Sequence, residues 1–297
     1  MKKAAVSSAA AFLLGTMRLN KYLSAHGVCS RREADRLICL GRVAVNKEKA
    51  VLGQEVTPGD EVTVCGEKVL AQADEIFLAV NKPRGVVVTT DRSRSDRVLE
   101  DLVPKDPRVF AVGRLDKESE GLILMTNNGD VSNRIQKARS FHEKEYVVCV
   151  DRLVTPGFLK KMREGVYLED LGRTTRPCRV RKVDAECFSI ILTEGMNRQI
   201  RRMCRTLGYE VTSLKRIRVM NILLGDLPEG AYRPLTQDEI SELKRQLHTR
   251  AEDSGNGTGK QTSAHERTRR SSGSGKQGLL CSKPRDHEQP RVRQALR

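Results

Sequence analysis

The sequence predicts an α+β protein in which a small N-terminal domain precedes a larger body built on a mixed, mostly antiparallel sheet. The chain has 297 residues, which exceeds the usual length of one domain. Short apolar runs typical of strands are separated by turn signals such as Pro58-Gly59 and Asn128-Gly129. Other segments repeat apolar residues with helical spacing and carry helix caps. We divide the chain into an extension, a small domain, a main body and a tail, at residues 1–16, 17–76, 77–248 and 249–297.

The small domain is expected to begin with two helices. Residues 18–25 have an apolar face, and Ser30 with Glu33 three residues later forms a capping box for the second helix. Short strands are expected at residues 43–46 and 61–64. A modest core of this kind can hold exposed basic side chains in register.

Arginines and a lysine lie off the apolar stripes of these helices. Such a charge run is usually a solvated face, but it can also grip phosphates. The order of Arg-Leu-Asn-Lys-Tyr-Leu, Cys-Ser-Arg-Arg-Glu-Ala-Asp and Pro-Gly-Asp resembles the small S4-like RNA-binding domain, first seen in a ribosomal protein. The resemblance covers residues 17–76 and implies phosphate contacts from Lys21, Arg31, Arg32 and Arg36.

The main body reads as strands with interspersed helices. Its order suggests an α+β body around a mixed, mostly antiparallel sheet, as in the family that the motifs below resemble. Helices are expected at residues 130–138, 155–165, 197–208 and 236–248. Strands are expected at residues 76–80, 86–90, 108–112, 121–126, 146–150, 188–193 and 209–220.

Asp116 lies on the loop between two of these strands, with Arg114 and Lys117 beside it. From spacing alone it could be a solvated acid in a charged turn. The surrounding pattern of Gly-Arg-Leu-Asp, Ser, Gly-Leu, Thr-Asn and Gly resembles the active-site motif of pseudouridine synthases, in the branch that modifies ribosomal RNA hairpins. The resemblance implies that Asp116 is the nucleophile, attacking either base or ribose. Arg114 would fill the gap left by the flipped-out nucleotide, and Leu115 and Lys117 would contact substrate.

Tyr146 stands in an alternating strand pattern that follows Lys144-Glu145. A tyrosine on a strand is more often a core residue than a catalyst. The Lys-Glu-Tyr run nevertheless resembles the second motif of the same family. That resemblance implies that Tyr146 stacks on the target base and acts as a general base.

Four arginines follow the glycine turn at residue 195, and they cannot all face the core. A basic surface helix would explain them equally well. Asn-Arg-Gln-Ile-Arg-Arg-Met resembles the third motif of the family, in which an arginine pairs with the catalytic Asp. By alignment that arginine is Arg201. Arg198 stands where many relatives carry His. The same resemblance places Asn197, Arg198, Gln199 and Ile200 against the substrate.

The formal net charge of +16 points to a polyanionic partner. Residues 251–297 hold ten Lys or Arg against five Asp or Glu and no periodic apolar pattern, so we expect a disordered, RNA-facing tail. No apolar run approaches the roughly 18 residues that span a bilayer.

The eight cysteines show no CxxC and no disulfide-like spacing, which favours buried free thiols and a cytoplasmic protein. Residues 1–16 resemble a weak secretory signal, or are an extension before a functional start at Met17; the RNA-enzyme motifs favour the second interpretation.

Pseudouridine formation is an isomerisation, and the sequence contains no P-loop, HExxH or clustered Cys/His ligands. We therefore expect no cofactor and no metal. The resemblance implies a uridine in a hairpin of 23S ribosomal RNA near the peptidyl-transferase centre, acted on by a monomer with no membrane contact. The alternatives are another ribosomal RNA hairpin, a transfer RNA, or an RNA-binding assembly factor that has lost the chemistry.

Overall fold

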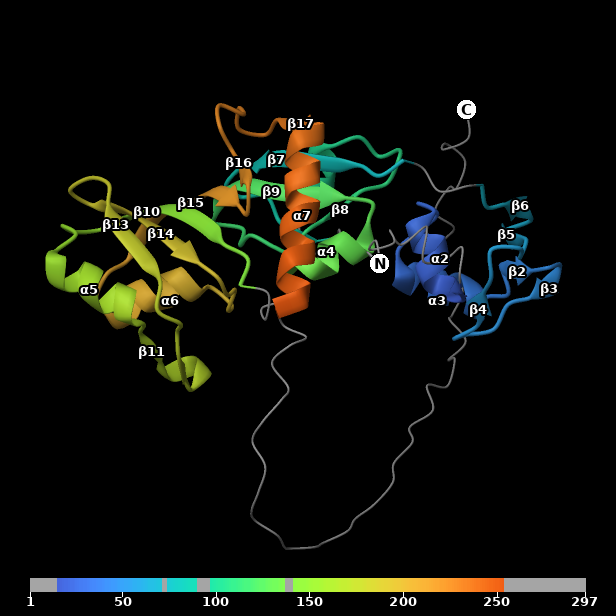
Figure 1. Cartoon of the computed structure of the whole chain (residues 1–297), viewed down its shortest axis with the longest axis horizontal. Coiled ribbons are helices and arrows are strands. Elements are labelled where there is room, and N and C mark those ends of the chain that lie inside the picture. Colours follow the sequence, from blue (N-terminus) through green and yellow to red (C-terminus); the bar gives the residue numbers. More distant parts are fainter. Residues whose placement is uncertain (1–14, 71–73, 90–96, 137–140, 254–297) are drawn as a thin grey trace, which may run out of the picture.

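The computed structural model describes residues 15–70, 74–89, 97–136 and 141–253. Figure 1 shows a small unit of helices and short strands at one end of the molecule and a long, continuous sheet through the rest. Residues 254–297 of the predicted tail and residues 1–14 of the predicted extension lie outside the described residues. Among the described helices, none is long and apolar enough to cross a membrane.

The small unit contains both predicted helices, α2 (Leu19–Ala25) and α3 (Arg31–Cys39). The side chain of Ser30 accepts a hydrogen bond from the Glu33 amide at 3.2 Å, as predicted, while the Glu33 carboxylate turns to Arg36. Strands form a pair, β1 (Met17–Arg18) with β4 (Glu55–Val56), and a four-stranded sheet in the order β3 (Glu48–Lys49), β2 (Val43–Val45), β5 (Val62–Val64), β6 (Glu67–Lys68).

The main body is organised by a nine-stranded sheet in which β15 and β9 run parallel while the other described strand pairs are antiparallel. This confirms the mixed, mostly antiparallel sheet. The path is β13 (Arg179–Lys182), β14 (Cys187–Leu192), β10 (Lys144–Val150), β15 (Val211–Val219), β9 (Glu120–Thr126), β7 (Phe77–Lys82) and β17 (Tyr232–Pro234), with β16 (Ile222–Leu223) on β15 and β8 (Phe110–Ala111) on β9. A separate hairpin joins β11 (Tyr167–Leu168) to β12 (Arg173–Thr174).

Helices cover the two halves of this sheet separately. α5 (Pro156–Glu164) and α6 (Gln199–Thr206) bury one core against the β13–β15 half, and Figure 1 shows both on that side. α4 (Gly129–Gln136) and α7 (Gln237–Asp253) bury a second core against the half that contains β9 and β7. The parallel β15–β9 contact joins the halves over two register pairs, so the sheet opens on either side of it.

Two predicted elements differ from the structure, and the end of a third cannot be compared. The expected strand at residues 86–90 reduces to an isolated bridge between Val87 and Val98 in the described part. The last helix runs to Asp253 rather than His248. Its start is as predicted, because Thr236 and Glu239 exchange side-chain and backbone hydrogen bonds in a complete capping box. The end of the predicted helix at residues 137–138 lies outside the described residues.

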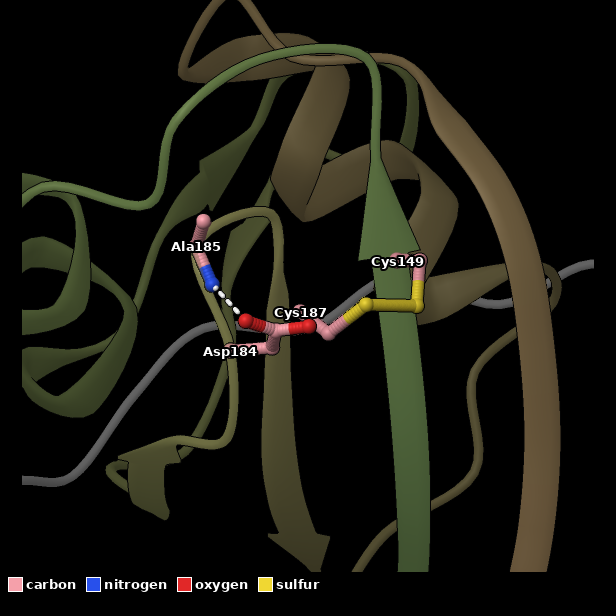
Figure 2. The surroundings of a disulfide bond; sticks show 4 residues. All are labelled: Cys149, Asp184, Ala185 and Cys187. Atoms are coloured by element: carbon pink, nitrogen blue, oxygen red, sulfur yellow. Dashed lines mark hydrogen bonds between the residues drawn. A yellow bond between two sulfur atoms is a disulfide. The ribbon is translucent and has the colours of Figure 1, made fainter.

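The expectation of free cysteines is wrong for one pair. Cys149 on β10 and Cys187 on β14 face each other across two neighbouring strands and form a disulfide, with their Cα atoms 4.1 Å apart (Figure 2). They are 38 residues apart in sequence, so only the strand register brings them together. No spacing rule can detect such a pair. Among the other described cysteines, Cys29 and Cys204 are buried, as expected of small apolar side chains.

Candidate active site

A pocket of 340 Å³ opens where β9 and β15 run parallel. Five segments that are distant in sequence contribute its walls: the β8–β9 loop, the end of α4, β10, the turn that leads into α6 with the start of that helix, and β15. The structure therefore gathers all three predicted motifs at one place. The predicted residues that line it are Arg114, Leu115, Asp116, Tyr146, Asn197, Arg198, Gln199, Ile200 and Arg201, whereas Lys117 lies exposed outside it.

The loop that carries Asp116 is held by its backbone. Ser119 donates its amide to the Asp116 carbonyl at 3.0 Å, closing a tight turn. The fully buried ammonium of Lys82 donates to the carbonyls of Pro83 at 2.8 Å and Ser119 at 2.7 Å. Burial lowers the pKa of Lys82 to about 8, against the opposing effect of Asp116. The sequence alone gives no reason to single out this lysine.

Among the described residues, the Asp116 carboxylate forms its ion pair with Arg198 and not with Arg201. The distance from Arg198 Nη1 to Asp116 Oδ2 is 3.9 Å, and both side chains are partly exposed. Arg201 instead donates to the backbone carbonyls of Glu118 at 3.0 Å and Val211 at 3.2 Å. Arg201 and Asp116 therefore do not form the expected ion pair, although the negative charge of Asp116 opposes the lowering of the Arg201 pKa. Burial is the main cause that lowers the pKa of Arg201, followed by repulsion from Arg198.

Tyr146 lies on β10 between Ile190 of β14 and Arg216 of β15. It is half-buried, lines the pocket, and packs against two cores: the α5–α6 core described above and a further core that includes Val80, Leu115 and Ile123. Leu115 and Ile200 are buried in these two cores and present apolar walls to the pocket. A flat, apolar surface with a tyrosine ring suits the face of a planar base.

Two cations in the pocket had no role assigned from the sequence. The Arg216 side chain is 3% exposed, and its Nε donates to the Leu122 carbonyl at 2.6 Å. Its Nη2 is buried without a hydrogen-bond partner among the described residues. Lys144 lines the same pocket, and burial, with a smaller effect of Arg216, lowers the pKa of its ammonium to about 8. An unpaired buried donor is costly, so the pair indicates a site for an acceptor or an anion.

Gln199 has a different environment from the one its motif suggested. Its side-chain amide donates to the buried carboxylate of Glu194 at 2.9 Å and accepts from the Met196 amide at 3.1 Å. Glu194 also accepts from the Arg176 amide at 2.9 Å. These bonds shape the turn at the start of α6, which presents Asn197 and Arg198 to the pocket.

The predicted phosphate contacts of the small unit are partly occupied within the protein. Lys21 Nζ lies 2.9 Å from Asp130 Oδ1 of α4, and Arg36 Nη2 lies 2.7 Å from Glu33 Oε1. Arg31 donates to Asn20 at 3.4 Å, and Arg32 is exposed. Lys21 therefore joins the small unit to the main body.

The fold and the pocket define an enzyme that acts on RNA through a pseudouridylate synthase domain. Residues 76–206 match the family described as RNA pseudouridylate synthase, and residues 17–62 match the S4 domain. A crystal structure of a pseudouridylate synthase aligns with a TM-score of 0.58 at 28% identity, over 76% of this chain and 99% of that one.

The curated relatives make the assignment more specific. The chain is 47% identical over 230 residues to the dual-specificity RNA pseudouridine synthase RluF of Escherichia coli strain K12, which covers 77% of this chain and 78% of that protein. It is 34% identical over 235 residues to the ribosomal large subunit pseudouridine synthase B of Bacillus subtilis strain 168, over 76% of this chain and 95% of that protein. The chain belongs to the family of RNA pseudouridine synthases with an S4 domain.

Proposed function

We propose that this pseudouridine synthase isomerises a uridine in a hairpin of 23S ribosomal RNA near the peptidyl-transferase centre, with Asp116 as the nucleophile. The observation that carries the proposal is the position of Asp116. This residue lines the 340 Å³ pocket, and its Oδ2 atom lies 3.9 Å from Arg198 Nη1. That volume lies in the range of roughly 300–1,000 Å³ typical of small-molecule pockets, which suits one flipped-out base.

Pseudouridine formation is an isomerisation, so the substrate gains and loses no atoms. The bond from N1 of uracil to C1′ of the ribose breaks, a bond from C5 to C1′ forms, and the proton on C5 leaves while N1 gains one. Asp116 adds to the base or to the ribose and is released again, which divides the isomerisation into easier steps. Tyr146 stacks on the base and accepts the C5 proton. Arg114 occupies the space that the base has left.

The two arginines have separate tasks in this scheme. Arg198 neutralises the Asp116 carboxylate directly, while Arg201 holds the loop through the Glu118 carbonyl. Lys144 and Arg216 both line the pocket; Arg216 Nη2 is buried without a partner among the described residues, whereas Lys144 Nζ donates to the His142 carbonyl at 3.4 Å. When the glycosidic bond breaks, negative charge develops on the uracil ring and its oxygens. Fixed cations aimed at that charge lower the barrier, because they need no reorganisation during the reaction.

The similarity to a relative named for dual specificity supports a second substrate. We infer that this chain accepts a transfer RNA as well as the ribosomal hairpin. We further propose that it acts as a cytoplasmic monomer. The competing assignment is that this protein modifies a different ribosomal RNA hairpin, as a sister enzyme would. The same assay would then find pseudouridine at a different position.

The test compares wild type with Asp116→Asn and the matched control Glu118→Gln. Glu118 is an exposed carboxylate two residues away that pairs with Arg84 at 3.1 Å. Each protein is incubated with unmodified 23S ribosomal RNA and with transfer RNA, and pseudouridine is mapped by carbodiimide treatment and primer extension. Wild type and Glu118→Gln are expected to produce the same new stop, and Asp116→Asn none. Turnover by Asp116→Asn at the wild-type rate would reject the nucleophile.

A further inference from the structure

A second pocket lies where the S4-domain unit meets the main body. We name it the junction pocket; its volume is 360 Å³. α2 and the start of α3 form one wall, and β8 and α4 form the other, as their proximity in Figure 1 illustrates. The lining residues used below are Lys21, Arg31, Arg108, Phe110, Asn133 and Gln136.

The junction pocket carries an excess of positive charge. Its cations come from both units, because Lys21 and Arg31 belong to α2 and α3 and Arg108 precedes β8. Among the described lining residues, Asp130 is the one carboxylate, and Lys21 pairs with it at 2.9 Å. Within the described chain, the Arg31 guanidinium donates to the neutral side chain of Asn20 at 3.4 Å. A concave site with this balance attracts an anion such as a phosphate.

The remaining lining offers what a base needs. Phe110 is half-buried in the wall, and its ring tip lies 3.9 Å from the position that a Cβ would take on Gly129. Asn133 and Gln136 are exposed amides on the same wall. Bases stack on aromatic rings, and amides can bond to base edges. The cations, the aromatic ring and the amides together fit a nucleotide. None of these features alone would identify the ligand.

The junction pocket adjoins the catalytic pocket. Gln136, the last residue of α4, lines both of them. Its side chain lies 3.8 Å from the position that a Cβ would take on Gly113, which opens the Asp116 loop. A single RNA strand whose target base enters the catalytic pocket therefore passes Gln136 on its way to the junction pocket.

We propose that the junction pocket binds a second unpaired nucleotide of the RNA substrate, close to the target uridine in sequence. The base stacks on Phe110, and its phosphate lies between Arg31 and Arg108. This inference rests on the proposed action on a structured RNA. It makes the S4-domain unit part of the specificity site, because two of the cations that face the pocket come from it. A hairpin that can extrude two nearby nucleotides is then the preferred substrate.

The test uses full-length protein with Phe110→Ala, Arg108→Gln and the control Arg134→Gln. Arg134 is an exposed arginine on α4 outside both pockets. The RNA is the 23S ribosomal RNA hairpin near the peptidyl-transferase centre that the proposed function names, intact or with one abasic nucleotide at each of its unpaired positions. The first two variants are expected to weaken binding of the intact hairpin about tenfold, as loss of one stacked base or one phosphate contact would. The control is expected to bind like wild type.

The abasic series identifies the nucleotide. One position should weaken wild-type binding about tenfold and have no further effect on Phe110→Ala, because both changes remove the same stacking contact. Thermal melting verifies that the variants are folded, and Arg108→Gln keeps the test open if Phe110→Ala unfolds. Binding of both variants at wild-type affinity would overturn the proposal. Tight binding of free adenosine or uridine monophosphate in the pocket, with RNA affinity unchanged in the variants, would assign it to a free nucleotide and also overturn it.

Binding is measured by fluorescence anisotropy and does not require turnover. Failure of the proposed function is therefore distinguishable: a protein that binds the hairpin through Phe110 and makes no pseudouridine rejects the proposed function and keeps this inference.

Discussion

The backbones of Gly121 and Arg216 touch at the centre of the sheet. A Cβ at position 121 would lie 2.3 Å from the Arg216 carbonyl oxygen, and the φ of Gly121 is +98°. This contact is one of the two register pairs that join β9 to β15. It explains the glycine that follows the Asp116 loop in the motif, because any side chain there would push the two halves of the catalytic pocket apart.

Gly121→Ala is therefore expected to lower the free energy of unfolding by about 3 kcal/mol or more, through the backbone clash and the strained positive φ. Activity should fall with it, since β15 carries Arg216 into the pocket. Urea denaturation measures the effect. Gly59→Ala is the control, because no atom lies within 4 Å of a Cβ at that position. Equal stability of the two variants would contradict the close approach.

The roles of the two arginines can be separated by replacement with lysine and glutamine. Arg198→Lys keeps a charge near Asp116 and should retain part of the turnover, whereas Arg198→Gln should lose about tenfold or more of kcat. In Arg201→Lys a single Nζ on a shorter side chain replaces the two nitrogens, Nη1 and Nη2, that reach the Val211 and Glu118 carbonyls, so it should be as damaging as Arg201→Gln. Single-turnover rates on the mapped hairpin measure both. Similar rescue by lysine at both positions would show that the arginines act only through charge.

Sequence patterns predicted those elements that are long enough to show a period. The apolar run of β9 and the helix that follows it are examples. Two-residue strands such as β3 and β6 were missed because two residues cannot define an alternation. The motifs likewise located Asp116 and Tyr146, because a family motif can be matched residue by residue along the sequence. The pairing of Cys149 with Cys187 could not be found in this way, because it depends on strand register.

The same limit applies to the charges in the site. Lys82 is the last residue of β7, in an Asn-Lys-Pro run, and only the fold shows that its ammonium is buried under the Asp116 loop. Arg216 is one of several basic residues in β15, and sequence alone gives no reason to choose it. Whether Arg198 or Arg201 reaches Asp116 depends on side-chain geometry at the start of α6.

Removal of residues 1–73 tests whether the main body folds without the S4-domain unit. The two have separate buried cores, so the truncated protein should keep its cooperative unfolding. The cut must spare Glu75, because its carboxylate pairs with Lys244 of α7 at 2.5 Å and accepts from Asn128 at 2.7 Å. We expect a higher KM for RNA with a smaller change in kcat, measured with the mapped hairpin. An unchanged KM would exclude the unit from substrate binding.

Lys144 offers a test of the cations through pH. Burial lowers the pKa of its ammonium from 10.5 to about 8, with Arg216 as the charged group that adds to the shift. A lowered lysine pKa means that the unfolded chain binds more protons between about pH 8 and 10.5, so folded stability rises with pH across that window. Below it, the buried ammonium costs the folded state up to about 3 kcal/mol.

Lys144→Met should therefore be at least as stable as wild type at pH 7, while its turnover falls, since the charge that faces the departing base is lost. In wild type, kcat/KM should decline as the pH rises through about 8, and this decline should be smaller in Lys144→Met, where Lys82, whose pKa is also lowered to about 8, still titrates near that pH. The exposed Lys161→Met on α5 serves as the control and should keep the wild-type profile. Pseudouridine formation on the mapped hairpin is followed from about pH 6 to about pH 10, with melting curves at each pH. A Lys144→Met protein that retains both rate and profile would remove Lys144 from the mechanism, and Arg216 alone would then face the base.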